Sequence, residues 1–382
     1  MKSDILSDTV RISQEVANLR KQGHTILDLG VGETLVPLDQ IIRKSLSNNS
    51  SAERFNYPPV TGLTDTIEAF CYYMRRRFSV SISSENSLIT CGGKHASYLA
   101  SRISLTKNDK AMLCRPYWPS FSAQAKICSA TTVYVKSNDQ FKISLSDLND
   151  AYDEKCKLLY LNNAGNPSGA LYSESELLNI LQWAKDHNVL ILSDEVYLAI
   201  DYEDTKSPSL ATLDPDLEHS IIIQSCSKSF AMTGLRVGFL IANKNRIKQL
   251  TAMQSQTIGN TSALAQLAAK DALLNYEVIE KSLTKELKFR RDLMATHLMQ
   301  KFKWKGAIPL TSLYYFLPIS LFTNKPSSSL DLSVRLLKEA GVCVVPGSAF
   351  GEDKHLRLSF GASPDTIEKA MEDLYRWRSI NE

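Results

Sequence analysis

Short apolar runs recur between residues 86 and 242, and Gly, Pro, Asn, Asp or Lys residues bound each of them. Runs of this length and punctuation are typical of buried strands. They lie at 87–91, 111–114, 132–135, 158–161, 189–193, 221–224 and 237–241. Segments with helical apolar spacing separate several of them, and the segment 173–185 begins with a serine suited to cap a helix. The alternation predicts an α/β fold whose large domain has a mostly parallel mixed sheet flanked by helices.

The C-terminal part of the chain follows a different pattern. Residues 262–302 are helical in character and too long for one ordinary helix, so they predict two or more. Strand-like pieces at 313–317, 342–345 and 356–360 alternate with helical stretches at 330–340 and 365–378. This mixture predicts a smaller α/β domain, and we expect the N-terminal stretch to pack with it. We therefore predict a large domain at 46–285 and a small domain formed by 1–45 and 286–382.

The composition limits the kinds of molecule that the protein is expected to bind and the compartment in which it is expected to lie. Lys and Arg number 44 against 41 Asp and Glu, and neither sign forms a long run, so no nucleic-acid partner is expected. The seven cysteines lack CxxC spacing and are odd in number, which favours neither a disulfide framework nor zinc. The apolar runs are shorter than the ~20 residues of a membrane-spanning helix, and the first ten residues lack a signal-like apolar core. We expect a soluble cytoplasmic protein without a membrane partner.

Ligands of mostly parallel sheets gather at the carboxyl ends of the strands. The polar or small residues that follow the predicted strands there are Gly92, Asn162, Asp194 and Ser225. These positions are the first candidates for a binding site.

The segment SCSKSFAMTGLRVG at 225–238 places Lys228 directly after a predicted buried strand. A lysine that forms a Schiff base must lose its proton near neutral pH, and Arg236 would lower its pKa by adding a nearby positive charge. Ser225, Ser227 and Arg236 would also make a cradle for a phosphate. A strand-to-loop junction with a solvated lysine is the other interpretation of this segment alone.

Seven further motifs accompany this segment in a fixed order. They are YPPVTG at 57–62, GGKHA at 92–96, PYW at 116–118, NPSG at 166–169, SDEVY at 193–197, PG at 346–347 and LRLSF at 356–360. Together with the pattern SxSKxxxxxGxRxG at 225–238, the chain resembles the fold-type I aminotransferases, the aspartate aminotransferase superfamily. The resemblance implies the PLP-dependent transferase fold, the cofactor pyridoxal 5'-phosphate on Lys228, and ping-pong transfer of an amino group from an L-amino acid to a 2-oxo acid.

The resemblance also assigns residues around the cofactor ring. Asp194 would pair with the pyridine nitrogen and keep it protonated, so that the ring can accept electrons. Asn166 and Tyr197 would hydrogen-bond the phenolic oxygen, and Trp118 would stack on the ring face. Lys228 would serve a second time as the base that moves the substrate proton from Cα to C4'. Lys228, Asp194 and Tyr197 are thus the residues assigned to catalysis.

The phosphate is assigned to a second group of residues. The backbone amides of Gly92, Gly93 and Lys94, at a strand-to-helix turn, would add donors to the side chains of the 225–236 segment. Tyr57 matches a family residue that reaches the phosphate bound by the neighbouring subunit. This match implies a homodimer with shared sites.

Arg357 matches the family arginine that binds the substrate α-carboxylate, a geometry that suits a guanidinium fork. Gly32 lies in the turn that brings its backbone to the substrate, and Trp118 and Asn166 are assigned to the substrate as well. Lys94 resembles a lysine that holds the distal carboxylate in one subgroup of bacterial aspartate aminotransferases. A phosphate-side lysine is the equal alternative for Lys94.

The chain departs from the family pattern at three places. Ala164 replaces the first proline of the run NNAGNPSG at 162–169, the N-terminal turn reads GVGETLV at 30–36, and TSLYY at 311–315 replaces the common Gly-Ala/Thr-Phe-Tyr run. Because these loops lie near the substrate side chain, the sequence leaves the substrate open.

Other chemistries are also weighed. C-S lyases and ring-forming synthases of this fold share the same lysine, aspartate and arginine, so they remain an alternative outcome. A PLP-dependent transcription regulator is disfavoured because about 25 residues precede the 27–30 turn, too few for a DNA-binding domain. The sequence has no metal-binding motif, and His95 is expected to be structural. Glu33, with Asp28 and Asp39, is interpreted as a solvated loop acid.

Overall fold

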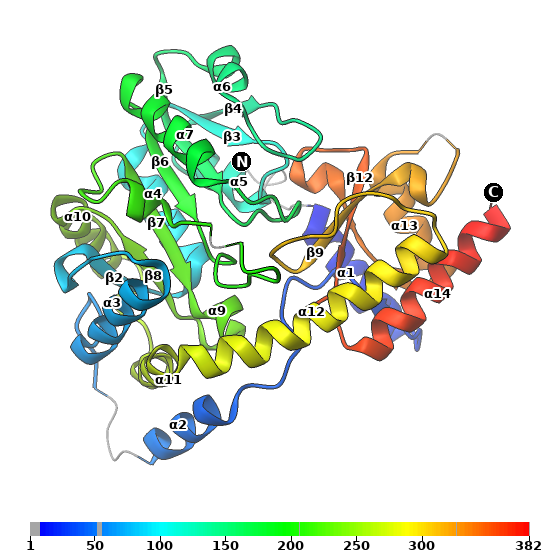
Figure 1. The fold of residues 1–382 in the computed structure, drawn as a ribbon, viewed down its shortest axis with the longest axis horizontal. Helices are drawn as coiled ribbons and strands as arrows, with labels where there is room; N and C mark the ends of the chain where they lie inside the picture. The colour runs from blue at the N-terminus through cyan, green and yellow to red at the C-terminus, as the bar shows by residue number, and fades with distance from the viewer. Residues whose placement is uncertain (1–7, 52–55, 206, 326, 382) are drawn as a thin grey trace.

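The computed structural model describes residues 8–51, 56–205, 207–325 and 327–381. Figure 1 shows a larger body built around one long twisted sheet and a smaller body that carries both ends of the described chain. The helix α12 (Tyr276–Gln300) runs from the first body to the second, where it lies beside α14 (Pro364–Asn381) (Figure 1). Every described helix is too short or too polar to span a bilayer.

The large sheet in the described part of the chain has the strand order β2-β8-β7-β6-β5-β3-β4. β8 is antiparallel to both its neighbours, and the other pairs are parallel, so the expected mostly parallel mixed sheet is confirmed. Each of the seven predicted strands is present. Their bounds are β2 (Ser87–Thr90), β3 (Lys110–Cys114), β4 (Thr131–Val135), β5 (Cys156–Asn162), β6 (Leu190–Asp194), β7 (Ser220–Ser225) and β8 (Gly238–Ile241).

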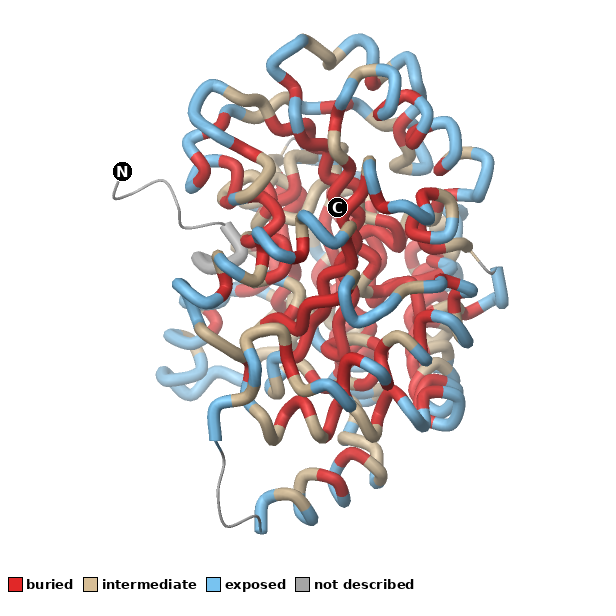
Figure 2. The backbone as a smooth tube through the Cα atoms, turned by 90° about the vertical axis from the view of Figure 1, so that its left-hand side faces the viewer, coloured by how far each residue is buried: buried red, intermediate tan, exposed pale blue. Residues whose placement is uncertain are grey.

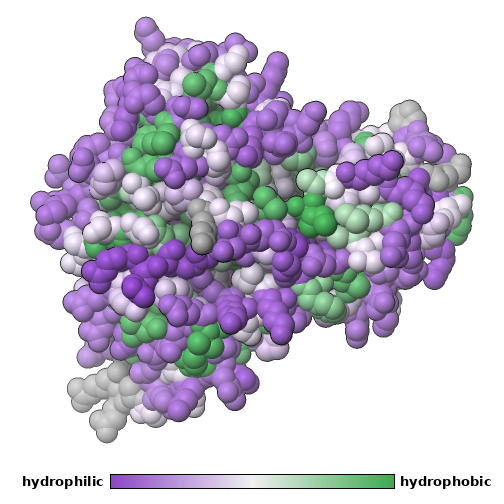
Figure 3. Space-filling view, in the orientation of Figure 1, coloured by the Kyte–Doolittle hydropathy of each residue, from purple (hydrophilic) through white to green (hydrophobic). Residues whose placement is uncertain are grey.

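Both faces of this sheet are covered, which explains why its central strands are apolar at nearly every position. Neighbouring residues such as Leu158 and Leu159 point into different hydrophobic clusters on the two faces. Figure 2 shows buried segments through the middle of the molecule and exposed segments around its outline. The outer face seen in Figure 3 is mostly hydrophilic, with hydrophobic side chains in small groups.

The helices around the large sheet begin and end near the predicted positions. In α7, the Ser173 side chain accepts the Glu176 amide and Glu176 accepts the Ser173 amide, so the expected cap is present. The helical region after residue 262 is divided, as expected, between α11 and α12. Besides α12, the helices around the large sheet are α2 (Gln40–Ser50), α3 (Thr64–Phe78), η1 (Ser84–Asn86), α4 (Gly92–Ser104), α5 (Pro119–Ile127), α6 (Leu145–Ala151), α7 (Glu174–Asp186), α8 (Leu210–Leu213), α9 (Cys226–Ser229), η2 (Thr233–Leu235), α10 (Lys244–Ser255) and α11 (Ala263–Leu274).

The smaller body contains two short sheets. β1 (Leu27–Asp28) pairs in parallel with β10 (Val342–Cys343), while β11 (Val345–Pro346), β12 (His355–Ser359) and β9 (Tyr314–Pro318) form an antiparallel sheet. The single strand expected at 342–345 was wrong, because the chain passes from one sheet to the other at Val344. The helices of this body are α1 (Asp8–Lys21), η3 (Ile319–Leu321), α13 (Ser329–Ala340), η4 (Gly347–Phe350) and α14.

The division into domains stays a prediction, but the packing bears on where it falls. Along α12, Ile279 belongs to the hydrophobic cluster of the large sheet, whereas Leu283 and Leu287 belong to that of the smaller body, so the change of cluster falls shortly before the expected boundary at 285. The helix α2 packs against α11, and its Ile42 is buried in the large cluster. The helix α2, and with it residues 40–45 of the predicted small domain, therefore packs with the large body.

Candidate active site

A cavity of about 660 Å³ lies where the carboxyl ends of β5, β6 and β7 face the smaller body. Strands of a parallel sheet place their following residues at one edge, so residues distant in sequence meet there. The predicted residues that line the cavity are Gly32, Gly93, Lys94, Trp118, Asn166, Asp194, Tyr197, Ser225, Ser227, Lys228, Arg236 and Arg357. The structure thus brings together all the predicted site residues except Gly92 and Tyr57, which do not line it.

Lys228 lies in α9, the short helix that follows β7, and Ser225 caps this helix by accepting the amide of Ser227. The Lys228 Nζ donates a hydrogen bond to the carbonyl oxygen of Gly32 in the N-terminal turn. Burial lowers the pKa of Lys228 to about 8, and the nearby positive charges of Arg357 and Arg236 act in the same direction. A fraction of this lysine is therefore unprotonated near neutral pH.

Asp194 ends β6 and is only 6% exposed. Its side chain accepts one hydrogen bond, from the backbone amide of Val196 at 3.3 Å. Burial raises the pKa of Asp194 to about 7, and the neighbouring Glu195 adds to the rise. No cation of the described residues forms an ion pair with this carboxyl, although Lys228 lies close enough to oppose the rise. In the described part of the chain, Asp194 is thus a buried acid without an ion-pair partner.

The other end of the cavity is built to receive an anion. The helix α4 begins there at Gly92 and Gly93, and the first amides of a helix are natural donors to a phosphate. Gly92 has φ +76°, and a Cβ at this position would lie 2.5 Å from Nη2 of Arg236. Ser225 and Ser227 contribute hydroxyl groups that are 2.9 Å apart. A helix N-terminus and a guanidinium therefore lie together at this end of the cavity.

Arg357 approaches the cavity from β12 and is 6% exposed. Its Nη1 donates to Oδ1 of Asn166 at 3.0 Å, and its Nη2 donates to the carbonyl of Gly30 at 2.8 Å. Its Nε is buried and has no partner among the described residues. Part of the guanidinium fork thus remains available to a carboxylate.

The chain matches the family described as aminotransferase class I and II over residues 24–374. It belongs to the class I and II aminotransferases. Similar proteins include an aspartate aminotransferase of Geobacillus stearothermophilus, 30% identical over 382 residues that cover 97% of this chain and 96% of the relative. A probable aspartate/prephenate aminotransferase of Rickettsia prowazekii is 31% identical over 375 residues, 95% and 94% of the two chains.

Solved structures agree with this assignment. The aspartate aminotransferase from Thermus thermophilus with maleate has a TM-score of 0.91 and 27% identity, covering 97% of both chains. The expected fold class and the expected reaction are therefore confirmed. This aminotransferase uses pyridoxal 5'-phosphate to move an amino group between an amino acid and a 2-oxo acid.

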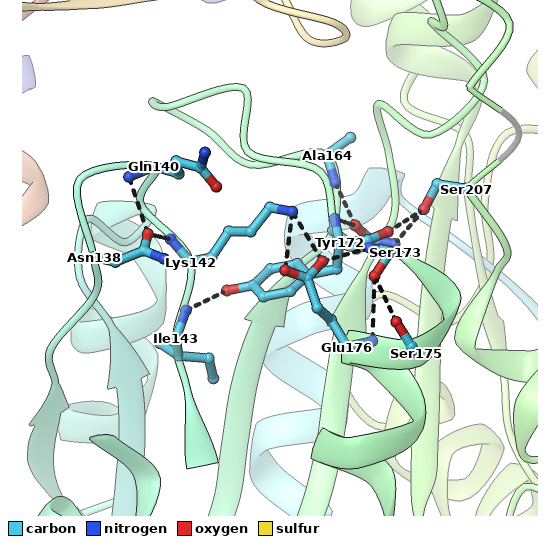
Figure 4. A network of polar contacts seen from close by, with 11 residues as sticks. Asn138, Gln140, Lys142, Ile143, Ala164, Tyr172, Ser173, Ser175, Glu176 and Ser207 are labelled. Carbon is cyan, nitrogen blue, oxygen red and sulfur yellow. Dashed lines mark hydrogen bonds and ion pairs between the residues drawn. The ribbon is translucent and has the colours of Figure 1, made fainter. Parts of the chain in front are cut away.

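The loop that carries Asn166 in the aminotransferase is braced by the network drawn in Figure 4. The buried Oδ1 of Asn163 accepts the amides of Ala164 and Tyr172, and the Tyr172 hydroxyl accepts the amide of Ile143. Ala164 has φ +62°, a conformation that the ring of proline forbids. The alanine that stands in place of the family proline therefore permits the path that the loop takes.

Two residues of this cavity were missed or misjudged from the sequence. Tyr314 was noted only as part of a departure from the family pattern, yet it lines the cavity, and its hydroxyl lies 2.7 Å from that of Tyr197. Glu33 is exposed, as expected of a loop acid, but it also lines the cavity and raises the pKa of Lys228. Neither contact has a sequence signal, because each joins segments about 120 or more positions apart.

Tyr57 is 93% exposed in the aminotransferase chain. It is an aromatic residue held away from its own cavity. A site shared between two subunits would account for this exposure.

Proposed function

We propose that the preferred amino donor is an acidic L-amino acid such as aspartate or glutamate, and that Lys228 holds the cofactor. The observation that carries the proposal is that two cationic side chains, Arg357 and Lys94, line the same cavity as Lys228. The relatives named aspartate aminotransferase and the maleate, a dicarboxylate, in the Thermus thermophilus structure support the same class of substrate.

The residues present fit pyridoxal 5'-phosphate at both ends of the cavity. At the ring end, the buried Asp194 has no ion-pair partner among the described residues, and a protonated pyridine nitrogen would supply one. Tyr197, Asn166 and Trp118 line the cavity and would contact the ring, whose role when bound is to accept electrons from the bonds at the substrate Cα. At the phosphate end stand the α4 amides and a group of side chains, Ser225, Ser227 and Arg236.

Lys228 is suited to two roles because its pKa is about 8. Unprotonated, it can bind the cofactor carbonyl, and once released it can move a proton between the substrate Cα and C4'. The carbonyl of Gly32 fixes the Nζ in the cavity and links it to the N-terminal turn.

The two ends of an acidic substrate are assigned to different cations. Arg357 is held by Asn166 and Gly30 and would bind the α-carboxylate with its remaining donors. Lys94 places its Nζ 5.3 Å from the centroid of the Trp118 ring, and burial and Arg236 lower its pKa. A distal carboxylate would give this partly buried ammonium a partner of opposite charge.

The test is a comparison of amino donors by the absorbance change of the holoenzyme as its cofactor becomes pyridoxamine phosphate. We expect aspartate or glutamate to convert the cofactor faster than leucine or phenylalanine, and a 2-oxo acid to reverse the change. Lys94→Met should raise KM for the acidic donor about 10- to 100-fold, because it removes a charge-assisted bond, and leave leucine within about 2-fold. Lys126→Met, an exposed lysine on α5, is the matched control.

Two other outcomes would be decisive. If Lys94→Met weakens cofactor binding and affects all donors alike, Lys94 serves the phosphate and the acidic preference loses its support. Lys228→Ala should remove the absorbance of the lysine-bound cofactor, and persistence of that absorbance would refute the assignment of Lys228.

The assembly and location belong to the same proposal. The exposure of Tyr57 supports a homodimer in which this residue reaches the partner's phosphate. The seven cysteines are all unpaired, which supports a reducing compartment such as the cytoplasm.

A further inference from the structure

Tyr314 begins β9 and is 1% exposed. In the antiparallel sheet it lies opposite Ser359, and Phe316 lies opposite Arg357. Residues two apart on a strand point to the same face, so Tyr314 and Arg357 are diagonal neighbours on one face. The Cζ of Arg357 is 4.2 Å from the centroid of the Tyr314 ring and 5.1 Å from that of Phe350.

The hydroxyl of Tyr314 has a different partner. It lies 2.7 Å from the hydroxyl of Tyr197, a buried phenol whose pKa is raised by burial first and then by Tyr314. It also faces the N-terminal turn, since a Cβ at Gly32 would lie 3.4 Å from it. One side chain therefore contacts the arginine, the phenol and the turn whose carbonyl accepts Lys228.

A pair of hydroxyl groups has a direction, because each can donate only one hydrogen. When the Tyr197 hydroxyl donates to an acceptor in the cavity, it can serve Tyr314 only as an acceptor. Tyr314 must then be the donor, and accepting this bond makes Tyr197 a stronger donor in turn. The direction of the pair thus depends on what occupies the cavity.

We infer that Tyr314 is a positioning residue that couples the carboxylate-binding arginine to the phenol beside the cofactor. Its ring orients the guanidinium of Arg357, and its hydroxyl strengthens the hydrogen bond that Tyr197 donates to the ring oxygen. The inference rests on the roles proposed above for Tyr197 and Arg357. The Tyr314 side chain thus has two functions, one in its ring and one in its hydroxyl. Substitution can remove the hydroxyl alone or the hydroxyl together with the ring.

Charged and titratable groups from four elements lie near Tyr197. Its charged and titratable neighbours are Tyr314 from β9, Arg357 from β12, Asp194 from β6, and Lys228 from α9, whose Nζ is 5.9 Å from the Tyr197 ring centroid. Substituting Tyr314 by phenylalanine changes one hydroxyl and leaves the three charged groups in place.

The experiment titrates the absorbance of the bound cofactor in the holoenzyme of three single variants, one double variant and a control. A hydrogen bond to the ring oxygen of the cofactor stabilises the unprotonated form of the lysine-bound cofactor. Weakening that bond should therefore raise the pH at the midpoint of the absorbance change. We expect Tyr314→Phe to raise it by about 0.5 unit and to leave KM for the amino donor within about 2-fold. Tyr314→Leu, which also removes the ring over Arg357, should raise KM about 10-fold.

Tyr315→Phe is the matched control. Tyr315 is also 1% exposed, and its hydroxyl donates to the carbonyl of Arg291, away from the cavity. A purely structural effect of losing a buried tyrosine hydroxyl would appear in both variants, and only Tyr314→Phe should move the midpoint.

Tyr197→Phe decides whether Tyr314 acts through Tyr197. We expect Tyr314→Phe to have no further effect on the midpoint in the Tyr197→Phe background. A midpoint unchanged in Tyr314→Phe, or shifted equally in both backgrounds, overturns the inference. If Tyr197→Phe moves the midpoint and Tyr314→Phe does not, the role of Tyr197 stands and only this inference fails; if neither does, both fail.

Discussion

At the scale of the residue, the cavity contains the carboxyl group of Asp194, and burial disfavours the charged form of this group. The pKa of Asp194 rises from 3.8 to about 7 on folding, so the folded protein binds a proton that the unfolded chain releases between these pH values. Stability therefore falls as the pH rises through this window, and above it the ionised carboxyl costs on the order of 2–4 kcal/mol. A cationic ring nitrogen would offset this cost, which links folding to cofactor binding.

Asp194→Asn tests this link in the cofactor-free protein. At pH 8 we expect the unfolding midpoint of the variant to lie a few degrees above that of the unsubstituted protein, because no charge is buried. The difference should shrink as the pH falls from 7 toward 4, and cofactor binding should weaken. Thermal unfolding at several pH values measures the difference in unfolding midpoint. Asp216→Asn, a substitution at an exposed position, is the control. A gain that is the same at every pH would contradict the prediction.

At the scale of the element, the first turn of α4 depends on a residue without a side chain. Gly92 adopts φ +76° and lies against the guanidinium of Arg236, which itself donates to the carbonyl of Thr233 at 2.9 Å. The turn and the arginine therefore share one small space, and the phosphate end of the cavity depends on both.

Gly92→Ala should displace Arg236 and strain the turn. We expect the dissociation constant of the cofactor to rise at least about 10-fold, since a charge-assisted contact to the phosphate is disturbed. Gly234→Ala is the matched control, because Gly234 lies nearby in η2, and a Cβ there would meet nothing within 4 Å. Equal cofactor affinity in the two variants, measured by equilibrium titration, would show that the turn is not part of the phosphate site.

At the scale of the whole molecule, one cavity draws residues from both bodies of the chain. Lys228 follows a strand of the large sheet, whereas Arg357 and Tyr314 come from the antiparallel sheet of the smaller body. Within the smaller body, Arg290 of α12 joins the N-terminal and C-terminal parts of the chain, since it donates to the carbonyls of Leu35, Gly361 and Ala362. In the homodimer proposed above, Tyr57 would extend the same principle to a second copy of the chain.

A hybrid dimer tests the shared site. Tyr57→Ala and Lys228→Ala, co-expressed with different tags and purified as the mixed dimer, should form one intact site with about half of the activity of the unsubstituted dimer. Each homodimer should be far less active. If Tyr57 served its own chain, each site of the hybrid would carry one defect, and activity would not return.

The sequence by itself determined the strands of the large sheet and predicted the family. Apolar runs of strand length placed the seven strands of the large sheet, because strands buried on both faces must be apolar nearly throughout. The motifs around Lys228, Asp194 and Arg357 predicted the aminotransferase family through their resemblance to that family and their order along the chain.

Tertiary structure decided what local pattern cannot encode. The break at Val344, the packing of α2 on α11 and the contact of Tyr314 with Tyr197 all depend on partners far along the chain. The pKa values of Lys228 and Asp194 likewise depend on burial, which is a property of the assembled cavity and not of any segment. The sequence therefore predicted which groups carry the chemistry, and the fold determined their surroundings.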